Sequence, residues 1–132
     1  MGMLRLGIDL HGVIDSDIDK FKNFLCASKN IGIEIWIISG PDKEYIHREL
    51  KEYFIINGLH YDEILSVVDY LKSKGVKMWT DEKGRWWASD EDWWSCKAEI
   101  CMMHFVDIMI DDSERFGRYF ENISTKFVLY KI

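Results

Sequence analysis

Acidic residues stand at the ends of two short apolar runs, one near each end of the chain. Residues 6–13 contain Asp9, and residues 108–110 are followed by Asp111 and Asp112. Such runs are typical of buried parallel strands, whose carboxyl ends line the ligand crevice of an open α/β sheet. We therefore expect Asp9, Asp111 and Asp112 to meet. Crowded carboxylates repel one another unless a cation lies between them, and hard oxygen ligands suit magnesium, so the sequence predicts a Mg²⁺ site.

The segments between these carboxylates alternate between strand and helix patterns. Residues 61–68 fit either a short strand or the first turn of a helix, and we favour a strand followed by a helix because βα alternation must return the chain to the sheet. After the first strand, the expected strands are at 33–38, within 61–68, at 108–112 and at 126–130. The first expected helix has capping candidates at 15–17 and ends near 30–32, and the second runs from Pro41 to 57–58. The third follows the strand within 61–68 and ends at Lys74, and two more span about 95–104 and 114–120.

This order predicts a single α/β domain, residues 1–132, with a Rossmann-like, mostly parallel sheet and helices on both faces. One small insert, at about residues 75–94, interrupts the alternation. Within it, residues 76–88 have the pattern of a β-hairpin, with turn-forming residues at 81–84 between two aromatic arms.

Charge and hydropathy exclude several classes of protein. The chain has 17 basic and 23 acidic residues, a net charge of −6, which does not favour loose binding to nucleic acid or an anionic membrane. No apolar stretch approaches the roughly 20 residues needed to span a bilayer, and no signal-peptide pattern is present. We therefore expect a cytoplasmic protein without a membrane partner.

Four motifs together resemble those of the haloacid dehalogenase-like (HAD) superfamily. That family has a strand ending in Asp-x-Asp-Gly-Thr/Val, a strand ending in Ser or Thr, a lysine at a helix start, and a strand ending in Asp-Asp. The matching residues here are Asp-Leu-His-Gly-Val at 9–13, Ser39, Lys97 and Asp111-Asp112. The motifs occur in the family's order and cover nearly the whole chain.

The resemblance implies a magnesium-dependent phosphatase in which Asp9 attacks phosphorus and forms an aspartyl-phosphate. It implies that Lys97 neutralises Asp9 and the phosphate. The implied phosphate-binding residues are Gly12, Ser39, Gly40 and Lys97. The implied metal ligands are Asp9, the backbone carbonyl of His11, and Asp112 ahead of Asp111.

His11 departs from the family pattern. It occupies the place of the second acidic residue, which in the family protonates the leaving group and then activates water. Imidazole exchanges protons near neutral pH, so His11 is a competent general acid-base. The substitution is equally compatible with slow turnover, another reaction or a lost activity. The alternative function is therefore a non-catalytic phosphate- or partner-binding module on the same fold.

Five of the six tryptophans fall at positions 79–94, on the hairpin and just after it. Hairpin packing accounts for some of them, and the rest suit stacking on a substrate or a contact in a homo-oligomer. The insert is too small for a closing cap, so we expect an open site. The expected partner is a phosphorylated small molecule or a macromolecular phosphate, with nucleotides and nucleic-acid ends leading. A phospho-accepting receiver domain is disfavoured, because there the acidic pair follows the first strand.

Overall fold

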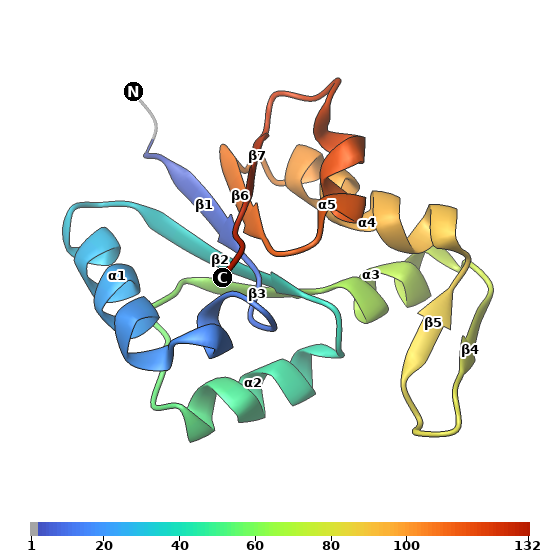
Figure 1. The fold of residues 1–132 in the computed structure, drawn as a ribbon, viewed down its shortest axis with the longest axis horizontal. Helices are drawn as coiled ribbons and strands as arrows, with labels where there is room; N and C mark the ends of the chain where they lie inside the picture. The colour runs from blue at the N-terminus through green and yellow to red at the C-terminus, as the bar shows by residue number, and fades with distance from the viewer. Residues whose placement is uncertain (1–2) are drawn as a thin grey trace.

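The core of the protein is a five-stranded parallel sheet (Figure 1). The computed structural model describes residues 3–132. In spatial order the strands are β3 (Glu63–Ser66), β2 (Glu34–Ser39), β1 (Arg5–Ile8), β6 (Ile108–Asp111) and β7 (Lys126–Leu129). All four strand pairs are parallel. The α/β class with helices flanking the sheet, predicted from the sequence, is confirmed.

Helices cover both faces of the sheet. One face carries α1 (Ile18–Asn30) and α2 (Lys43–Glu52), and the other carries α3 (Val67–Lys74), α4 (Asp90–Met103) and α5 (Glu114–Gly117). Short 3-10 turns occupy Ile14–Ser16 and Arg118–Phe120. Neighbouring residues of β2 alternate between the two cores, since Ile37 packs with α1 and α2 whereas Ile38 packs with α3 and α4.

Side-chain caps set the starts of the longer helices. A side-chain oxygen of the residue before each helix accepts a hydrogen bond from a backbone N–H in its first turn. These capping residues are Asp17 for α1, Asp42 for α2, Ser66 for α3 and Ser89 for α4. The α3 helix ends at Gly75, whose φ of +75° is the left-handed conformation that glycine adopts readily.

Two predicted helix boundaries were wrong. The α4 helix begins at Asp90 instead of about 95, because Ser89 caps it and three acidic residues fill its first turn. The α2 helix ends at Glu52, and Phe54 follows with a φ of +57°. Phe54 is 73% exposed, so it does not belong to the apolar face of that helix.

The predicted hairpin is present as β4 (Met78–Thr80) and β5 (Trp86–Ala88), paired antiparallel in a sheet of their own. It extends beyond α3 and α4, away from the main sheet (Figure 1). Among residues 3–132, no helix is long and apolar enough to cross a membrane.

Candidate functional site

The carboxyl ends of β1, β2 and β6 bring the predicted site residues together. Asp9 follows the last residue of β1, while Ser39 and Asp111 are the last residues of β2 and β6. Ile8 is in register with Ile37 on one side and Ile110 on the other, and the Asp9 amide donates to the Ile110 carbonyl at 3.0 Å. Because parallel strands end at one edge, the three side chains share one small volume.

Asp9 is the centre of this cluster. Its side chain is nearly buried, at 6% exposure. Oδ1 accepts a hydrogen bond of 2.7 Å from the Ser39 hydroxyl, and Oδ2 lies 3.2 Å from the Lys97 ammonium group. Both carboxylate oxygens therefore have a partner that fixes the orientation of the group.

Lys97 enters the cluster from the middle of α4, not from a helix start as predicted. The helix begins at Asp90, which places Lys97 in its third turn. The side chain is 1% exposed, and Nζ lies 2.5 Å from Asp111 Oδ2 and 4.3 Å from the centre of the Phe116 ring. The ammonium group nevertheless lies at the edge of the sheet, between the carboxylates of Asp9 and Asp111.

The two consecutive aspartates have different surroundings. Asp111 is fully buried, and both its oxygens have partners, Oδ2 in Lys97 and Oδ1 in the Ser113 amide at 3.0 Å. Asp112 is exposed and lies against Gly12. A Cβ at position 12 would come within 2.0 Å of Asp112 Oδ2, and Gly12 has a φ of +84°. Only glycine suits both requirements.

Gly12 and the start of α2 differ from the predicted phosphate-binding arrangement. The Gly12 amide donates to Asp15 Oδ1 at 2.7 Å, so the role of Gly12 visible here is to make room for Asp112. The first amides of α2 are also bonded to carboxylates, Lys43 to Asp69 at 3.0 Å and Tyr45 to Asp42 at 2.9 Å. The backbone near Gly40, before the helix, remains as the candidate for holding phosphate oxygens.

The site carries excess negative charge. Burial raises the pKa of Asp9 to about 6, with the charge of Asp111 adding to it and Lys97 opposing it. Burial acts to lower the pKa of Lys97, but the carboxylates of Asp9 and Asp111 outweigh it and raise that pKa above its usual range. Burial, reinforced by Asp111, also raises the pKa of Asp112. One lysine therefore faces more carboxylate charge than it neutralises.

The chemistry of these donors suits a magnesium ion. Asp9, Asp111 and Asp112 each offer an oxygen, and these oxygens lie within 4.8 Å of one another. Hard oxygen ligands on a partly neutralised acidic site fit Mg²⁺, which commonly binds through one or two carboxylates and keeps water in its other positions.

His11 contacts Glu49 of α2, a residue that the sequence reasoning missed. The Nε2 atom lies 2.8 Å from Glu49 Oε1 and 3.0 Å from Oε2. A carboxylate only accepts hydrogen bonds, so Nε2 carries a proton in this contact. Nδ1 is the ring nitrogen that does not bond to Glu49. Asp15 lies close by, with one oxygen within 4.8 Å of ligand atoms of His11 and Glu49. The sequence offered one signal for Glu49, which is an acidic residue next to Leu50, at the border of the apolar face of α2.

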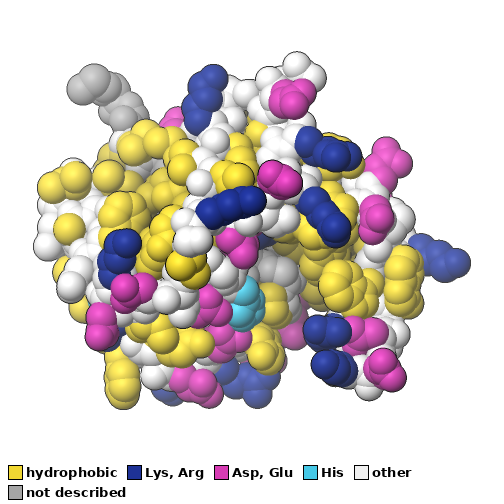
Figure 2. Space-filling model, in the orientation of Figure 1, with side chains coloured by type: hydrophobic (Ala, Val, Ile, Leu, Met, Phe, Trp, Pro, Cys, Tyr) yellow, Lys and Arg dark blue, Asp and Glu magenta, His cyan; other side chains and the backbone are white. Residues whose placement is uncertain are grey.

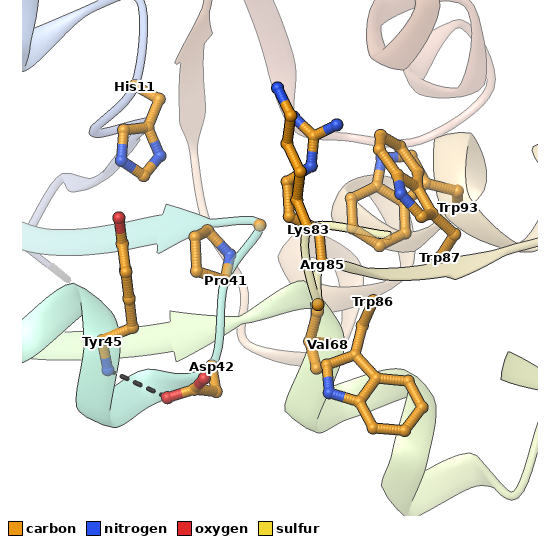
Figure 3. A pocket seen from close by; sticks show the side chains of 12 residues that line it. His11, Pro41, Asp42, Tyr45, Val68, Lys83, Arg85, Trp86, Trp87 and Trp93 are labelled. Carbon is orange, nitrogen blue, oxygen red and sulfur yellow. Dashed lines mark hydrogen bonds between the residues drawn. The ribbon is translucent and has the colours of Figure 1, made fainter. Parts of the chain in front are cut away.

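A cleft of about 690 Å³ opens beside Gly40 and separates the main sheet from the hairpin (Figure 3). One wall consists of His11, Gly40, Pro41, Asp42 and Tyr45, with Val68 below. The opposite wall consists of residues 83–87 of the hairpin and Trp93. In the view of Figure 2, acidic side chains gather around the histidine near the centre, while acidic and basic side chains are mixed on the side of the hairpin.

None of the five clustered tryptophans is fully buried. Trp94 packs on Phe116, with ring centres 4.7 Å apart, and Trp87 packs on Trp93 at 5.2 Å. Trp79 and Trp86 are 47% and 37% exposed. Hairpin packing therefore uses part of the aromatic surface and leaves part of it accessible.

Comparison with known proteins supports the fold and leaves the activity open. No family model matches the chain, and no curated protein matches it. The chain is similar to a solved structure of an uncharacterized protein from Corynebacterium glutamicum ATCC 13032 Kitasato, with a TM-score of 0.61 and 20% identity over 99% of this chain and 87% of that one. At this identity the likeness concerns the fold.

Proposed function

We propose that this chain is a magnesium-dependent phosphatase that works through an aspartyl-phosphate on Asp9. The observation that carries the proposal is the set of contacts around Asp9. A nearly buried carboxylate is held by a hydroxyl at 2.7 Å and an ammonium group at 3.2 Å, next to two further carboxylates. Phosphoryl transfer needs mainly positioning and charge neutralisation, and these residues supply both.

Each residue has a distinct task in this proposal. Asp9 attacks phosphorus as the bond from phosphorus to the leaving oxygen breaks, and water then attacks the aspartyl-phosphate and releases free phosphate. Ser39 and the backbone near Gly40 hold phosphate oxygens. Lys97 keeps Asp9 and the incoming phosphate in one place despite their like charges. Mg²⁺, held by Asp9, Asp112 and the His11 carbonyl, would supply positive charge to the transferring group.

His11 is the proposed general acid-base, and Glu49 is a positioning residue for it. Glu49 bonds to Nε2, so the proton given to the leaving oxygen comes from Nδ1 of the imidazolium form. The ring is then neutral, with its remaining proton on Nε2, and Nδ1 takes a proton from the attacking water. Because the ring also lines the cleft, a bound leaving group would have access to it.

The proposed compartment is the cytoplasm.

A non-catalytic phosphate- or partner-binding module is the second candidate. The observation that favours it is that the residue two positions after Asp9 is a histidine whose Nε2 is already bonded to Glu49. Such a module would bind phosphate in a magnesium-dependent way without releasing product.

Hydrolysis of an activated aryl phosphate tests the proposal, because its leaving group needs little protonation. Release of para-nitrophenol should require Mg²⁺, stop with a chelator, and be absent in Asp9→Asn. Asp19→Asn is the matched control, since Asp19 lies on α1 away from the carboxylate cluster. Equal release by Asp9→Asn and wild type would overturn the proposal. Magnesium-dependent phosphate binding without release by the wild type would favour the binding module.

A further inference from the structure

The hairpin side of the cleft is held in shape by Asp81. Its carboxylate accepts hydrogen bonds from the Lys83 and Arg85 amides at 2.9 and 3.0 Å. It also accepts from Arg85 Nε at 2.8 Å and from Trp87 Nε1 at 2.9 Å. The turn and the first residues of β5 therefore have a defined arrangement before any ligand arrives.

This turn holds one basic side chain that has no ion-pair partner among the described residues, although Asp81 and Glu82 balance its two basic residues in formal charge. The Arg85 guanidinium is paired with Asp81, whereas Lys83 makes no ion pair with an acidic side chain within residues 3–132. Figure 3 shows both basic side chains on the wall of the cleft that faces His11 and Tyr45. In a protein of net charge −6, an unpaired lysine in a cleft attracts a negatively charged ligand group.

The same wall offers aromatic surface. Trp86, Trp87 and Trp93 all line the cleft, and Trp86 remains 37% exposed although Lys72 Nζ lies 4.0 Å from the centre of its ring. A Cβ on Gly40 would lie 3.6 Å from Trp93. The aromatic wall therefore reaches the loop that follows Ser39, where the phosphate is proposed to bind.

We propose that this cleft selects a small phosphate ester whose leaving group carries a flat aromatic ring and a second anionic group. The ring would stack on the tryptophan wall and the second anion would pair with Lys83. A volume of about 690 Å³ suits a small molecule better than a nucleic-acid end, since small-molecule sites span roughly 300 to 1,000 Å³. The inference rests on the proposed function, because it assumes that the transferred phosphate lies at Asp9.

Four ligands separate the two features. Adenosine 5′-monophosphate has a ring and one phosphate, and adenosine 3′,5′-bisphosphate has a ring and two phosphates. Ribose 5-phosphate and ribose 3,5-bisphosphate are the matched ligands without an aromatic ring. Binding is measured by calorimetry with Mg²⁺ on the Asp9→Asn variant of the chain, so that no ligand is consumed. The adenosine bisphosphate should bind tightest, and each feature should contribute roughly tenfold.

Two substitutions and two controls on the hairpin assign the contributions. Lys83→Gln should remove most of the advantage of the second phosphate, and Trp86→Ala should remove most of the advantage of the ring. Lys77→Gln and Trp79→Ala are the controls, since both residues are exposed and neither lines the cleft. Circular dichroism confirms that each variant is folded. The comparison of the four ligands is made on the unaltered hairpin, so it tests the inference even if a hairpin variant fails to fold.

Equal affinity for the four ligands, or equal effects of the control and cleft substitutions, would overturn the inference. The proposed function is judged separately by hydrolysis of the aryl phosphate. Asp9-dependent hydrolysis without discrimination among the four ligands contradicts the inference alone. Discrimination without any hydrolysis supports the ligand class and contradicts the phosphatase.

Discussion

The Lys97 ammonium group lies 2.5 Å from Asp111 Oδ2, and both side chains are excluded from solvent, with exposures of 1% and 0%. The same nitrogen lies 3.2 Å from Asp9 Oδ2. This lysine therefore links the ends of β1 and β6 by charge. Because a buried charge without a partner is strongly destabilising, the stability of the fold and the chemistry of the site depend on the same side chain.

Replacing Lys97 with methionine should abolish activity and lower the free energy of unfolding by about 3 to 5 kcal/mol in the presence of a chelator, since two carboxylates lose their buried partner. Urea denaturation measures the change. Lys74→Met is the matched control, because Lys74 pairs with Glu99 of α4 at 2.8 Å in a partly exposed position. The Lys74→Met substitution should lower the free energy of unfolding by no more than about 1 kcal/mol. A loss for Lys97→Met no larger than the control would contradict the assigned role.

Without magnesium, stability should fall as pH rises through the range in which Asp9 ionises in the folded state. Burial raises its pKa from 3.8 to about 6, so between these values the folded protein binds more protons than the unfolded chain. The unfolding free energy of the wild type, relative to Asp9→Asn, should drop by at most about 3 kcal/mol across this range and level off above it. Urea titrations in chelator at several pH values measure this, and a relative stability that rises with pH would refute it.

Magnesium should raise the melting temperature of the wild type, because it binds only the assembled carboxylates. At a concentration about 100 times its dissociation constant, the gain is about 2.7 kcal/mol. Asp112→Ala should lose this response. Asp111→Ala should lose less of it, since both Asp111 oxygens are already bonded to Lys97 and Ser113. Differential scanning fluorimetry with Mg²⁺ and with chelator decides this, and identical wild-type melting temperatures would argue against the metal site.

His11→Ala should slow turnover of an unactivated phosphate ester by about 10²-fold to 10⁴-fold, the usual contribution of a positioned acid-base. His11→Asp should restore or raise activity. Glu49→Gln should lower kcat by roughly tenfold and change the pH profile, because it alters the group that orients the imidazole. The control is Glu52→Gln, at the end of the same helix. If Glu49→Gln matches Glu52→Gln in both rate and pH profile, Glu49 does not position His11.

The sequence was sufficient to place the main carboxylates. Asp9, Ser39 and Asp111 each end a run of strand-forming residues, and parallel strands end at one edge, so their meeting follows from local patterns and topology. Lys97 was also assigned to this edge, although its helix starts earlier than expected. Ser89 has the capping chemistry for that start, and the acidic residues that follow it are favourable in a first helical turn.

Other features depend on contacts that no local pattern specifies. Glu49 reaches His11 only because α2 packs beside the loop after β1, and 38 positions separate the two residues. The cleft forms only because the hairpin lies opposite the loop after β2, which brings Lys83 and Trp86 to the side facing Tyr45. These distances are set by tertiary packing, and a single sequence does not reveal them.

The most direct measurement is chemical trapping of the intermediate at Asp9. The protein is incubated with Mg²⁺ and a phosphate ester, then reduced with borohydride, which converts an aspartyl-phosphate to homoserine. Mass spectrometry of the digested chain locates the change. We predict homoserine at position 9 only when both substrate and Mg²⁺ are present. Release of phosphate with Asp9 unchanged, or reduction at another aspartate, would contradict the account.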